Sequence, residues 1–146
     1  MLFSRRKRHV TRILIVEDEP LVAFDNEMSL RAEGYVVVAT VDSVAEAIAI
    51  IDAEPLDLVL TDLSLSGEGS GLDVARHAAG KGVPVLIVSG ACPVEEDAPA
   101  IACLAKPYND RTLKAALAAI DRRLAGDTPG KVPPGLSFYA GANSGG

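Results

Sequence analysis

The sequence predicts an α/β protein built on a doubly wound parallel sheet. Three observations predict it: short continuous aliphatic runs recur along the chain, helical patterns separate them, and isolated polar residues follow directly after several of the runs. Continuous apolarity, as opposed to alternation, is typical of strands covered on both faces. With 146 residues and 49% hydrophobic content, the chain has the length for one domain with a sizeable core and is too short for two.

Each of the aliphatic runs predicts a strand. In chain order they are Arg12 to Val16, Tyr35 to Thr40, Leu56 to Leu60, Val83 to Val88 and Ile101 to Ala105.

The first helix follows the first run. Pro20 suits a first helical position and Gly34 suits a helix end. The apolar residues expected on its buried face are Leu21, Phe24, Met28 and Leu30 or Ala32. The side chains expected on its exposed face are Asn26, Ser29 and Arg31.

Four further helices are predicted. Ser43 and Glu46 have the spacing of a capping box that opens the second helix, and the third is expected over about Leu72 to Ala79. The fourth, between Cys92 and Ala100, contains two prolines and three consecutive acids, so we expect it to be short, irregular or mobile. The fifth is capped by Asn109 or Asp110, ends near Gly126 and has an apolar stripe. Its stripe is Leu113, Leu117, Ile120 and Leu124.

These elements predict five βα units in the flavodoxin-like strand order 2-1-3-4-5, over residues 11–125. Residues 126–146 are rich in glycine and proline and predict a flexible tail. The tail contains one hydrophobic island, Leu136 to Tyr139. We expect a disordered end, and the alternative is that this island docks on the domain or on a partner.

Composition limits the classes of function. The formal net charge of −6 disfavours general nucleic-acid binding. Residues 1–10 form a basic arm around Arg5 to Arg8, which we interpret as solvated because the apolar run behind it is too short for a secretory signal. No segment has the apolar length of a membrane span, so we expect a soluble, cytoplasmic protein. Cys92 and Cys103 lack metal or disulfide-scaffold spacing and are expected to be small buried thiols.

The polar residues after the strands predict a binding site, because ligands of open parallel sheets bind at the carboxyl ends of the strands. Glu17 and Asp18 follow the first strand, Asp62 the third, Ser89 the fourth and Lys106 the fifth. Two carboxylates about 4 Å apart repel by about 4 kcal/mol at an effective dielectric near 20, so the site must bind protons or a cation. Oxygen ligands with open positions suit Mg²⁺.

The expected chemistry is formation of an acyl phosphate on Asp62. An ionised carboxylate needs no base to attack phosphorus, but the incoming phosphoryl group needs its charge neutralised. Mg²⁺, Lys106 and the Ser89 hydroxyl would supply that neutralisation. Pro107 gives Lys106 a position where a cis peptide bond could turn the ammonium back into the pocket.

Four segments, "ILIVEDEP", "LVLTDLSL", "VLIVSG" and "LAKPY", resemble in order and spacing the signature segments of the response-regulator receiver domain of two-component signalling. The resemblance covers about Arg12 to Leu124. It implies that Asp62 accepts phosphate from a histidine kinase or a histidine phosphotransfer protein. It also implies that Glu17, Asp18, Asp62 and the carbonyl of Ser64 bind Mg²⁺, and that Ser89 and Lys106 bind the phosphoryl group.

The resemblance further implies a monomer or weak homodimer that passes its signal to an effector protein, and that catalyses at most its own phosphorylation and dephosphorylation. The exposed face of the first helix would meet the donor's helical bundle. Three departures stand out. Cys103 occupies the place of the usual aromatic switch residue, the loop from Ser64 to Gly71 lacks the usual proline, and we expect a stand-alone, single-domain regulator without an output domain.

Two other classes of function stay open. A phosphatase with an aspartyl nucleophile would also join a carboxylate, Mg²⁺ and a lysine, but it normally has a second acid two residues after the nucleophile, where this chain has Ser64. A receiver-like binding module that works without phosphate is the other alternative. Substrate turnover would identify the first, and partner binding indifferent to loss of Asp62 would identify the second.

Overall fold

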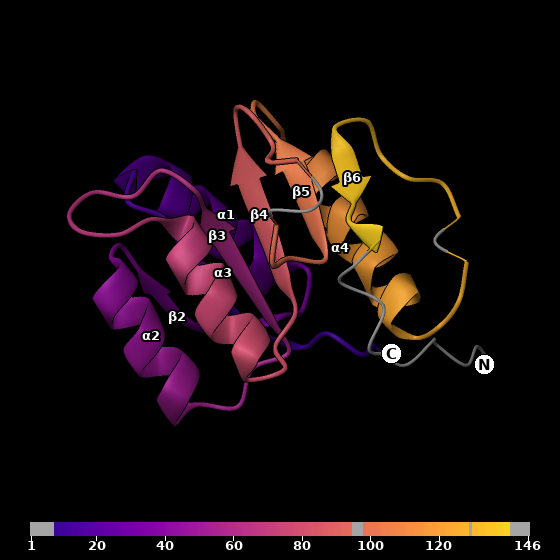
Figure 1. The fold of residues 1–146 in the computed structure, drawn as a ribbon. Helices are drawn as coiled ribbons and strands as arrows, with labels where there is room; N and C mark the ends of the chain where they lie inside the picture. Colours follow the sequence, from indigo (N-terminus) through magenta and orange to yellow (C-terminus); the bar gives the residue numbers. More distant parts are fainter. Residues whose placement is uncertain (1–7, 95–97, 129, 141–146) are drawn as a thin grey trace.

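The structure is a computed structural model, and it describes residues 8–94, 98–128 and 130–140. A six-stranded sheet in the order β2-β1-β3-β4-β5-β6 forms its centre (Figure 1). The strands are β1 (Arg12–Val16), β2 (Val36–Val41), β3 (Leu58–Asp62), β4 (Val85–Ser89), β5 (Ala102–Ala105) and β6 (Leu136–Phe138). The helices are α1 (Pro20–Ala32), α2 (Val44–Ala53), α3 (Gly71–Gly80) and α4 (Asp110–Leu124).

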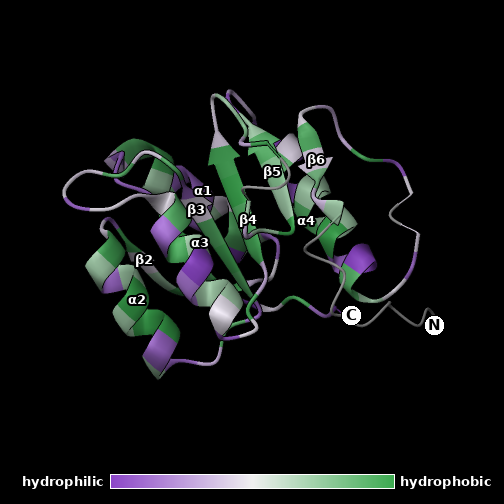
Figure 2. Ribbon diagram, viewed as in Figure 1, coloured by the Kyte–Doolittle hydropathy of each residue, from purple (hydrophilic) through white to green (hydrophobic). Residues whose placement is uncertain are grey.

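The helices cover the sheet on both faces, as continuous apolar strands require. Helices α1 and α4 lie on one face, and α2 and α3 lie on the other (Figure 1). Alternate residues of β1 divide between two cores: Ile13 and Ile15 join the α1 and α4 side, whereas Leu14 and Val16 join the α2 and α3 side. Figure 2 shows the resulting hydrophobic strands between helices with mixed surfaces. The predicted doubly wound α/β class is therefore confirmed.

The predicted strand order is confirmed for the five parallel strands, and the sheet then gains a sixth. Segment β6 pairs antiparallel with β5, with Leu136 opposite Leu104 and Phe138 opposite Ala102. Leu136 and Tyr139 are buried, and Arg123 of α4 stacks on the Phe138 ring at 4.7 Å. The prediction of a flexible tail is thus wrong over Leu136 to Tyr139, because this hydrophobic island covers the otherwise open edge of β5.

The number of helices also differs from the prediction. Between Cys92 and Ala100 the described residues form no helix, and residues 95–97 lie outside the described part of the chain. The prolines and the run of acids that argued for an irregular segment account for this result. The predicted fifth helix is therefore α4, and Asn109 caps it by accepting the Thr112 N–H at 2.8 Å.

The cysteines form a disulfide, Cys92 to Cys103, so the prediction of two free thiols is wrong. Cys103 lies in the middle of β5 and is fully buried, while Cys92 lies on the loop after β4 and is partly exposed. The spacing of two cysteines in sequence cannot predict such a bond, since it depends on how the loop after β4 folds back over β5.

The buried face of α1 is also different from the one predicted. Leu30 is buried as predicted, but the residues buried with it are Ala23 and Asn26, and Asn26 was expected on the exposed face. Leu21, Phe24 and Met28 are 75%, 61% and 53% exposed. Both sets have the same helical spacing, so periodicity alone could not distinguish them. The buried amide of Asn26 is compatible with this face because it donates to the Tyr108 hydroxyl at 2.9 Å.

The basic arm is described only from Arg8 onward, and Arg5 to Lys7 lie outside the described residues. Arg8 stacks on the Tyr35 ring at 4.2 Å. The next backbone N–H groups, of His9 and Val10, donate to the Asp121 carboxylate of α4. The entry into β1 is therefore fixed to the domain and not solvated throughout. Among the helices that the structure describes, none is long and apolar enough to cross a membrane.

Candidate functional site

The predicted acids meet at the carboxyl ends of β1 and β3. Glu17 and Asp18 directly follow β1, and Asp62 is the last residue of β3, the strand paired with β1. Carboxylate oxygens of Glu17, Asp18 and Asp62 lie within 4.8 Å of one another. Glu17 and Asp62 are buried, while Asp18 is partly exposed. The sheet topology thus concentrates three negative charges at one point.

Lys106 supplies the positive charge of the site. Its Nζ donates to Asp62 Oδ2 at 2.5 Å and lies 3.8 Å from Glu17 Oε1. Burial acts to lower the pKa of this ammonium, but the hydrogen bond to Asp62 and the charges of Glu17 and Asp62 outweigh it, so the pKa of Lys106 is raised. The Lys106–Pro107 peptide bond is cis, as hypothesised from the sequence.

Glu17 is the electrostatically costly member of the cluster. Burial raises the pKa of Glu17, the charges of Asp62 and Asp18 act in the same direction, and the Glu19 N–H and Lys106 oppose them. Glu17 Oε2 accepts the Glu19 N–H at 3.1 Å, but the buried Oε1 has no hydrogen-bond partner among the described residues. A buried carboxylate oxygen without a hydrogen-bond donor has an open position for a cation.

The loop after β3 closes over the acids. The Ser64 N–H donates to Asp62 Oδ1 at 3.1 Å, and the Ser66 hydroxyl donates to Asp18 Oδ2 at 2.6 Å. The loop returns at Gly71, where a Cβ would lie 2.0 Å from the Asp62 carbonyl oxygen, so only glycine fits there. Ser66 was missed in the sequence, because a serine in an irregular glycine-rich loop carries no positional signal.

Ser89 ends β4 beside the site and is buried. Its hydroxyl accepts the Ala91 N–H at 3.1 Å and donates to the Ala91 carbonyl at 3.0 Å. In the sheet, Ser89 lies opposite Ala105, the residue before Lys106. The five side chains predicted for the site therefore come from the ends of adjacent strands, with Ser89 turned toward its own loop.

The donor set fits a hard divalent cation. All the side-chain ligands are carboxylates, which Mg²⁺ prefers over the nitrogen and sulfur ligands typical of zinc or copper. The buried Glu17 Oε1, which accepts no hydrogen bond among the described residues, is the observation from the structure that supports this fit. Glu17, Asp18 and Asp62 are the residues of the described chain that could hold the ion.

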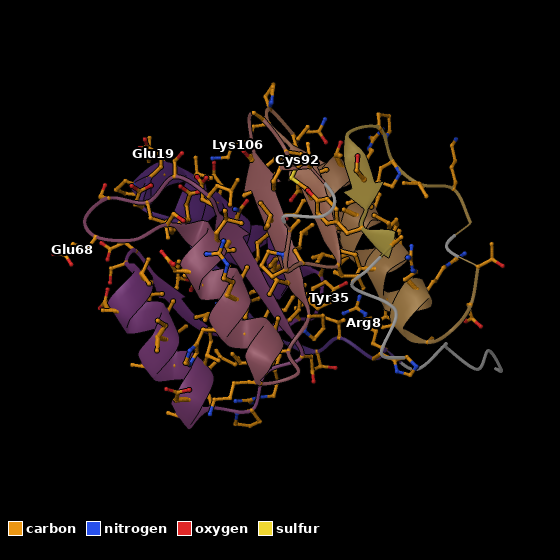
Figure 3. All side chains as sticks on the ribbon, in the orientation of Figure 1. Arg8, Glu19, Tyr35, Glu68, Cys92 and Lys106 are labelled. Carbon is orange, nitrogen blue, oxygen red and sulfur yellow. A yellow bond between two sulfur atoms is a disulfide. The ribbon has the colours of Figure 1, made fainter. Side chains whose placement is uncertain are left out.

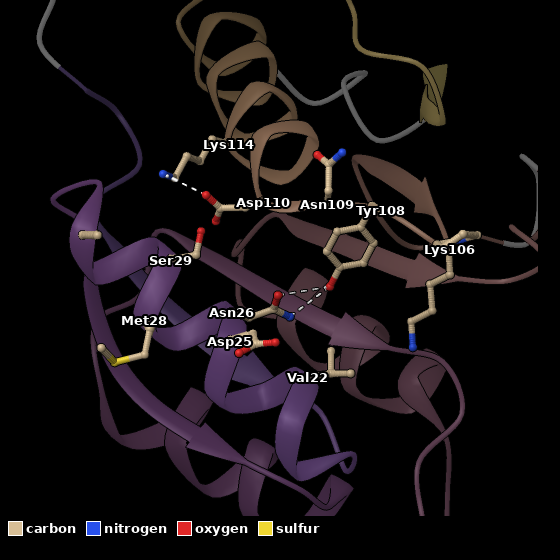
Figure 4. A pocket seen from close by; sticks show the side chains of 12 residues that line it. Val22, Asp25, Asn26, Met28, Ser29, Lys106, Tyr108, Asn109, Asp110 and Lys114 are labelled. Carbon is tan, nitrogen blue, oxygen red and sulfur yellow. Dashed lines mark hydrogen bonds and ion pairs between the residues drawn. The ribbon is translucent and has the colours of Figure 1, made fainter.

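A cavity of about 980 Å³ adjoins the site between α1 and α4 (Figure 4). Lys106 and Tyr108 line one end, and the Asp110–Lys114 ion pair of α4 lines the other. The Asn26–Tyr108 hydrogen bond joins two of its lining residues (Figure 4). Burial raises the pKa of the Tyr108 hydroxyl, with the Asn26 bond opposing the shift. Tyr108 was not predicted as a neighbour of the site, although it follows Lys106 by only two positions.

Comparison with known proteins identifies the domain. The family model described as response regulator receiver domain matches residues 13–118. The chain is 33% identical over 104 residues to the transcriptional regulatory protein PdtaR of Mycobacterium tuberculosis, a match that covers 67% of this chain and 50% of that protein. The chain thus spans about half the length of this curated relative.

Solved structures agree with the sequence match. A CheY-like response regulator receiver domain protein from Methanospirillum hungatei superposes with a TM-score of 0.68 at 29% identity, covering 80% of this chain and 95% of that one. A mutant of the anti-anti-sigma factor PhyR from Bartonella quintana superposes with a TM-score of 0.61 at 26% identity, covering 74% and 47%.

Proposed function

This chain belongs to the response-regulator receiver family, and from that premise we propose that it accepts a phosphoryl group on Asp62 and signals through protein contacts. One observation carries the proposal: the Asp62 carboxylate accepts a hydrogen bond from the Lys106 ammonium and lies beside the acids Glu17 and Asp18. That arrangement gives an ionised nucleophile beside both a fixed cation and a cluster suited to a metal ion.

In the proposed reaction, a carboxylate oxygen of Asp62 forms a bond to phosphorus while the bond from phosphorus to the donor's imidazole nitrogen breaks. The electron pair of that bond leaves with the imidazole. Lys106 neutralises charge on the phosphoryl oxygens, and the Ser89 hydroxyl donates to one of them after releasing the Ala91 carbonyl. The Ser64 backbone N–H donates to the other Asp62 oxygen and holds it in place.

Mg²⁺ is the proposed cofactor, held by Glu17, Asp18, Asp62 and the Ser64 backbone carbonyl. When bound, it would neutralise the charge that develops on the transferred group.

The proposed phosphoryl donor is a histidine kinase or a histidine phosphotransfer protein that docks on α1. The exposed Leu21, Phe24 and Met28 form an apolar stripe on this helix, which starts beside Glu17 and Asp18. A helical donor seated on the stripe would bring its phosphohistidine close to Asp62. We expect Phe24→Ala to slow phosphoryl transfer from a phosphorylated phosphotransfer protein at least about tenfold, a loss typical of an interface hot spot. The rate of phosphorylation by acetyl phosphate should not change. Val132→Ala, an exposed apolar residue of the tail, is the matched control.

The acceptor is tested by incubating the protein with acetyl phosphate and Mg²⁺ and measuring the intact mass. One phosphate adduct is expected on the wild type and on Asp25→Asn, which changes an exposed acid of α1, but not on Asp62→Asn or with EDTA. An adduct on Asp62→Asn would refute Asp62 as the acceptor.

The intact acid cluster with Lys106 favours phosphoryl acceptance over a phosphate-independent binding module. Ser64 in place of a second acid disfavours a phosphatase with turnover, so we propose that the only reaction catalysed is the protein's own phosphorylation and dephosphorylation. A cytoplasmic location and a monomer or weak homodimer are part of the same proposal. The net charge of −6 supports a role without direct nucleic-acid contact.

A further inference from the structure

The disulfide joins the two segments that carry Ser89 and Lys106. Cys92 comes three residues after Ser89, and Cys103 comes three residues before Lys106. The Cα atoms of the two cysteines are 6.0 Å apart. Figure 3 shows Cys92 and Lys106 at the same end of the sheet. The disulfide therefore connects the loop after β4, which follows Ser89, to β5, which precedes Lys106.

Besides this bond, one side-chain hydrogen bond from another segment holds the described residues of the loop after β4. The described residues between Cys92 and Ala100 form neither helix nor strand, and the Tyr139 hydroxyl donates to the Pro93 carbonyl at 2.9 Å. The Ser89–Ala91 turn immediately precedes Cys92. A covalent bond at Cys92 consequently restrains the segment whose rearrangement would free the Ser89 hydroxyl.

The two sulfurs differ in access. Cys103 is fully buried in the core on the α2 and α3 side, whereas Cys92 is partly exposed. An incoming thiolate would attack the Cys92 sulfur, and Cys103 would leave as the thiolate and take up a proton. A free cysteine packs as a small hydrophobe, so β5 can keep its place in the core after reduction.

We propose that Cys92 and Cys103 form a thiol–disulfide exchange site that controls phosphoryl transfer to Asp62, with a dithiol protein or small dithiol as the reductant. The inference rests on the proposed function. In the oxidised state the Cys92 tether holds Ser89 on Ala91 and slows transfer, and in the reduced state the loop moves and transfer is faster. In reducing compartments, disulfides are usually transient or redox-sensing. This favours a regulatory role for the disulfide and not a permanent structural one.

The exchange is balanced by the dithiol. Its first thiolate forms a mixed disulfide with Cys92 as the bond to Cys103 breaks. Its second thiolate then attacks the dithiol's own sulfur in that mixed disulfide, and Cys92 leaves as the thiolate. Two electrons pass from the dithiol to the cysteine pair, and the dithiol becomes a cyclic disulfide. Oxidised glutathione reverses the process by accepting the same two electrons.

The test compares acetyl phosphate labelling of the full chain in both redox states. Wild-type protein is oxidised with oxidised glutathione or reduced with dithiothreitol, desalted, and its thiols are counted by alkylation and mass. Cys92→Ser changes the partly exposed cysteine and cannot form the disulfide, so it serves as the control for the protein without this bond. Reduced wild type and Cys92→Ser should gain phosphate about fivefold or more faster than oxidised wild type, the usual lower range of coupling between sites. Cys92→Ser should not respond to dithiothreitol.

Equal rates for oxidised and reduced wild type would overturn the redox control and leave the phosphoryl-acceptor function standing. Two free thiols after oxidation, or a dithiothreitol response in Cys92→Ser, would also overturn it. No adduct in any sample would instead refute the proposed function, and with it any control of transfer by the cysteine pair.

Discussion

Glu17→Gln is expected to stabilise the protein when no divalent ion is present. The substitution removes one negative charge from the cluster of Glu17, Asp18 and Asp62. It keeps a side-chain oxygen that can accept the Glu19 N–H. It also places an amide, which can donate to a neighbouring carboxylate, where Glu17 Oε1 makes no hydrogen bond among the described residues.

The magnitude follows from the distances. Carboxylate oxygens of the cluster lie within 4.8 Å of one another, where unit charges interact by about 3.5 kcal/mol at an effective dielectric near 20. Glu17 is repelled on this scale by both Asp18 and Asp62, while Lys106 at 3.8 Å attracts it by about 4.4 kcal/mol. The net repulsion is about 2 to 3 kcal/mol, which screening at the partly exposed rim reduces to about 1 to 2 kcal/mol.

The assay is urea unfolding of both proteins at neutral pH, with EDTA and then with increasing Mg²⁺. With EDTA, Glu17→Gln should be the more stable by about 1 to 2 kcal/mol. Mg²⁺ at about 100 times its dissociation constant should stabilise the wild type by about 2.7 kcal/mol and the variant by less, which reverses the order. Glu19→Gln, an exposed acid at the start of α1 with no side-chain cap bond, is the control and should change stability by less than about 1 kcal/mol.

The pH dependence gives the same reasoning a second check. Burial holds the pKa of Glu17 above its ordinary 4.5, so the folded state binds this proton more tightly than the unfolded state does. The wild type should therefore lose stability relative to Glu17→Gln as the pH rises from near 4.5, and the difference should be complete above the folded pKa. A metal-free Glu17→Gln less stable than the wild type, or equal stabilisation of both by Mg²⁺, would refute the electrostatic account.

Two further substitutions probe the scaffold of the site. Gly71→Ala places a Cβ 2.0 Å from the Asp62 carbonyl oxygen, so it should lower the free energy of unfolding in urea by at least about 3 kcal/mol or prevent folding. Gly80→Ala, on the same helix with open space around it, should be neutral or stabilising by up to about 1 kcal/mol. Equal effects of the two substitutions would contradict the steric argument. Tyr139→Phe removes the hydrogen bond to the Pro93 carbonyl, so it should lower the free energy of unfolding by about 1 kcal/mol and speed hydrogen exchange of the backbone amides in the loop after β4. Unchanged exchange in that loop would show that this hydrogen bond does not hold it.

The acid cluster could be predicted because its residues directly follow strands whose pattern is plain. Once β1 and β3 are neighbours in a parallel sheet, Asp18 and Asp62 must lie at the same edge, whatever the loops do. Lys106 follows by the same reasoning from β5. The contact of Ser66 with Asp18 could not be predicted, because it depends on the path of a loop without periodicity.

The face of α1 shows a different limit. Leu30 is buried as predicted, but hydrophobicity alone favoured Leu21, Phe24 and Met28 over Ala23 and Asn26, which are the residues buried beside it. The Tyr108 hydroxyl, 82 positions away in sequence, accepts a hydrogen bond from the buried Asn26 amide, and this contact makes burial of that face possible. The apolar stripe is then exposed, where a partner can reach it.

The tail has a consequence for how any signal leaves the domain. The Ala105 N–H donates to the Gly135 carbonyl and the Tyr139 N–H donates to the Ile101 carbonyl, so hydrogen bonds from the tail occupy the outer edge of β5 along its length. A partner that adds a strand to the sheet at this side must pair with β6 or displace it. Because Tyr139 also holds the loop that carries Cys92, displacing the tail would release a restraint on Ser89. Partner binding at β6 and thiol exchange at Cys92 should therefore act on the same loop, with reduction making displacement of the tail easier.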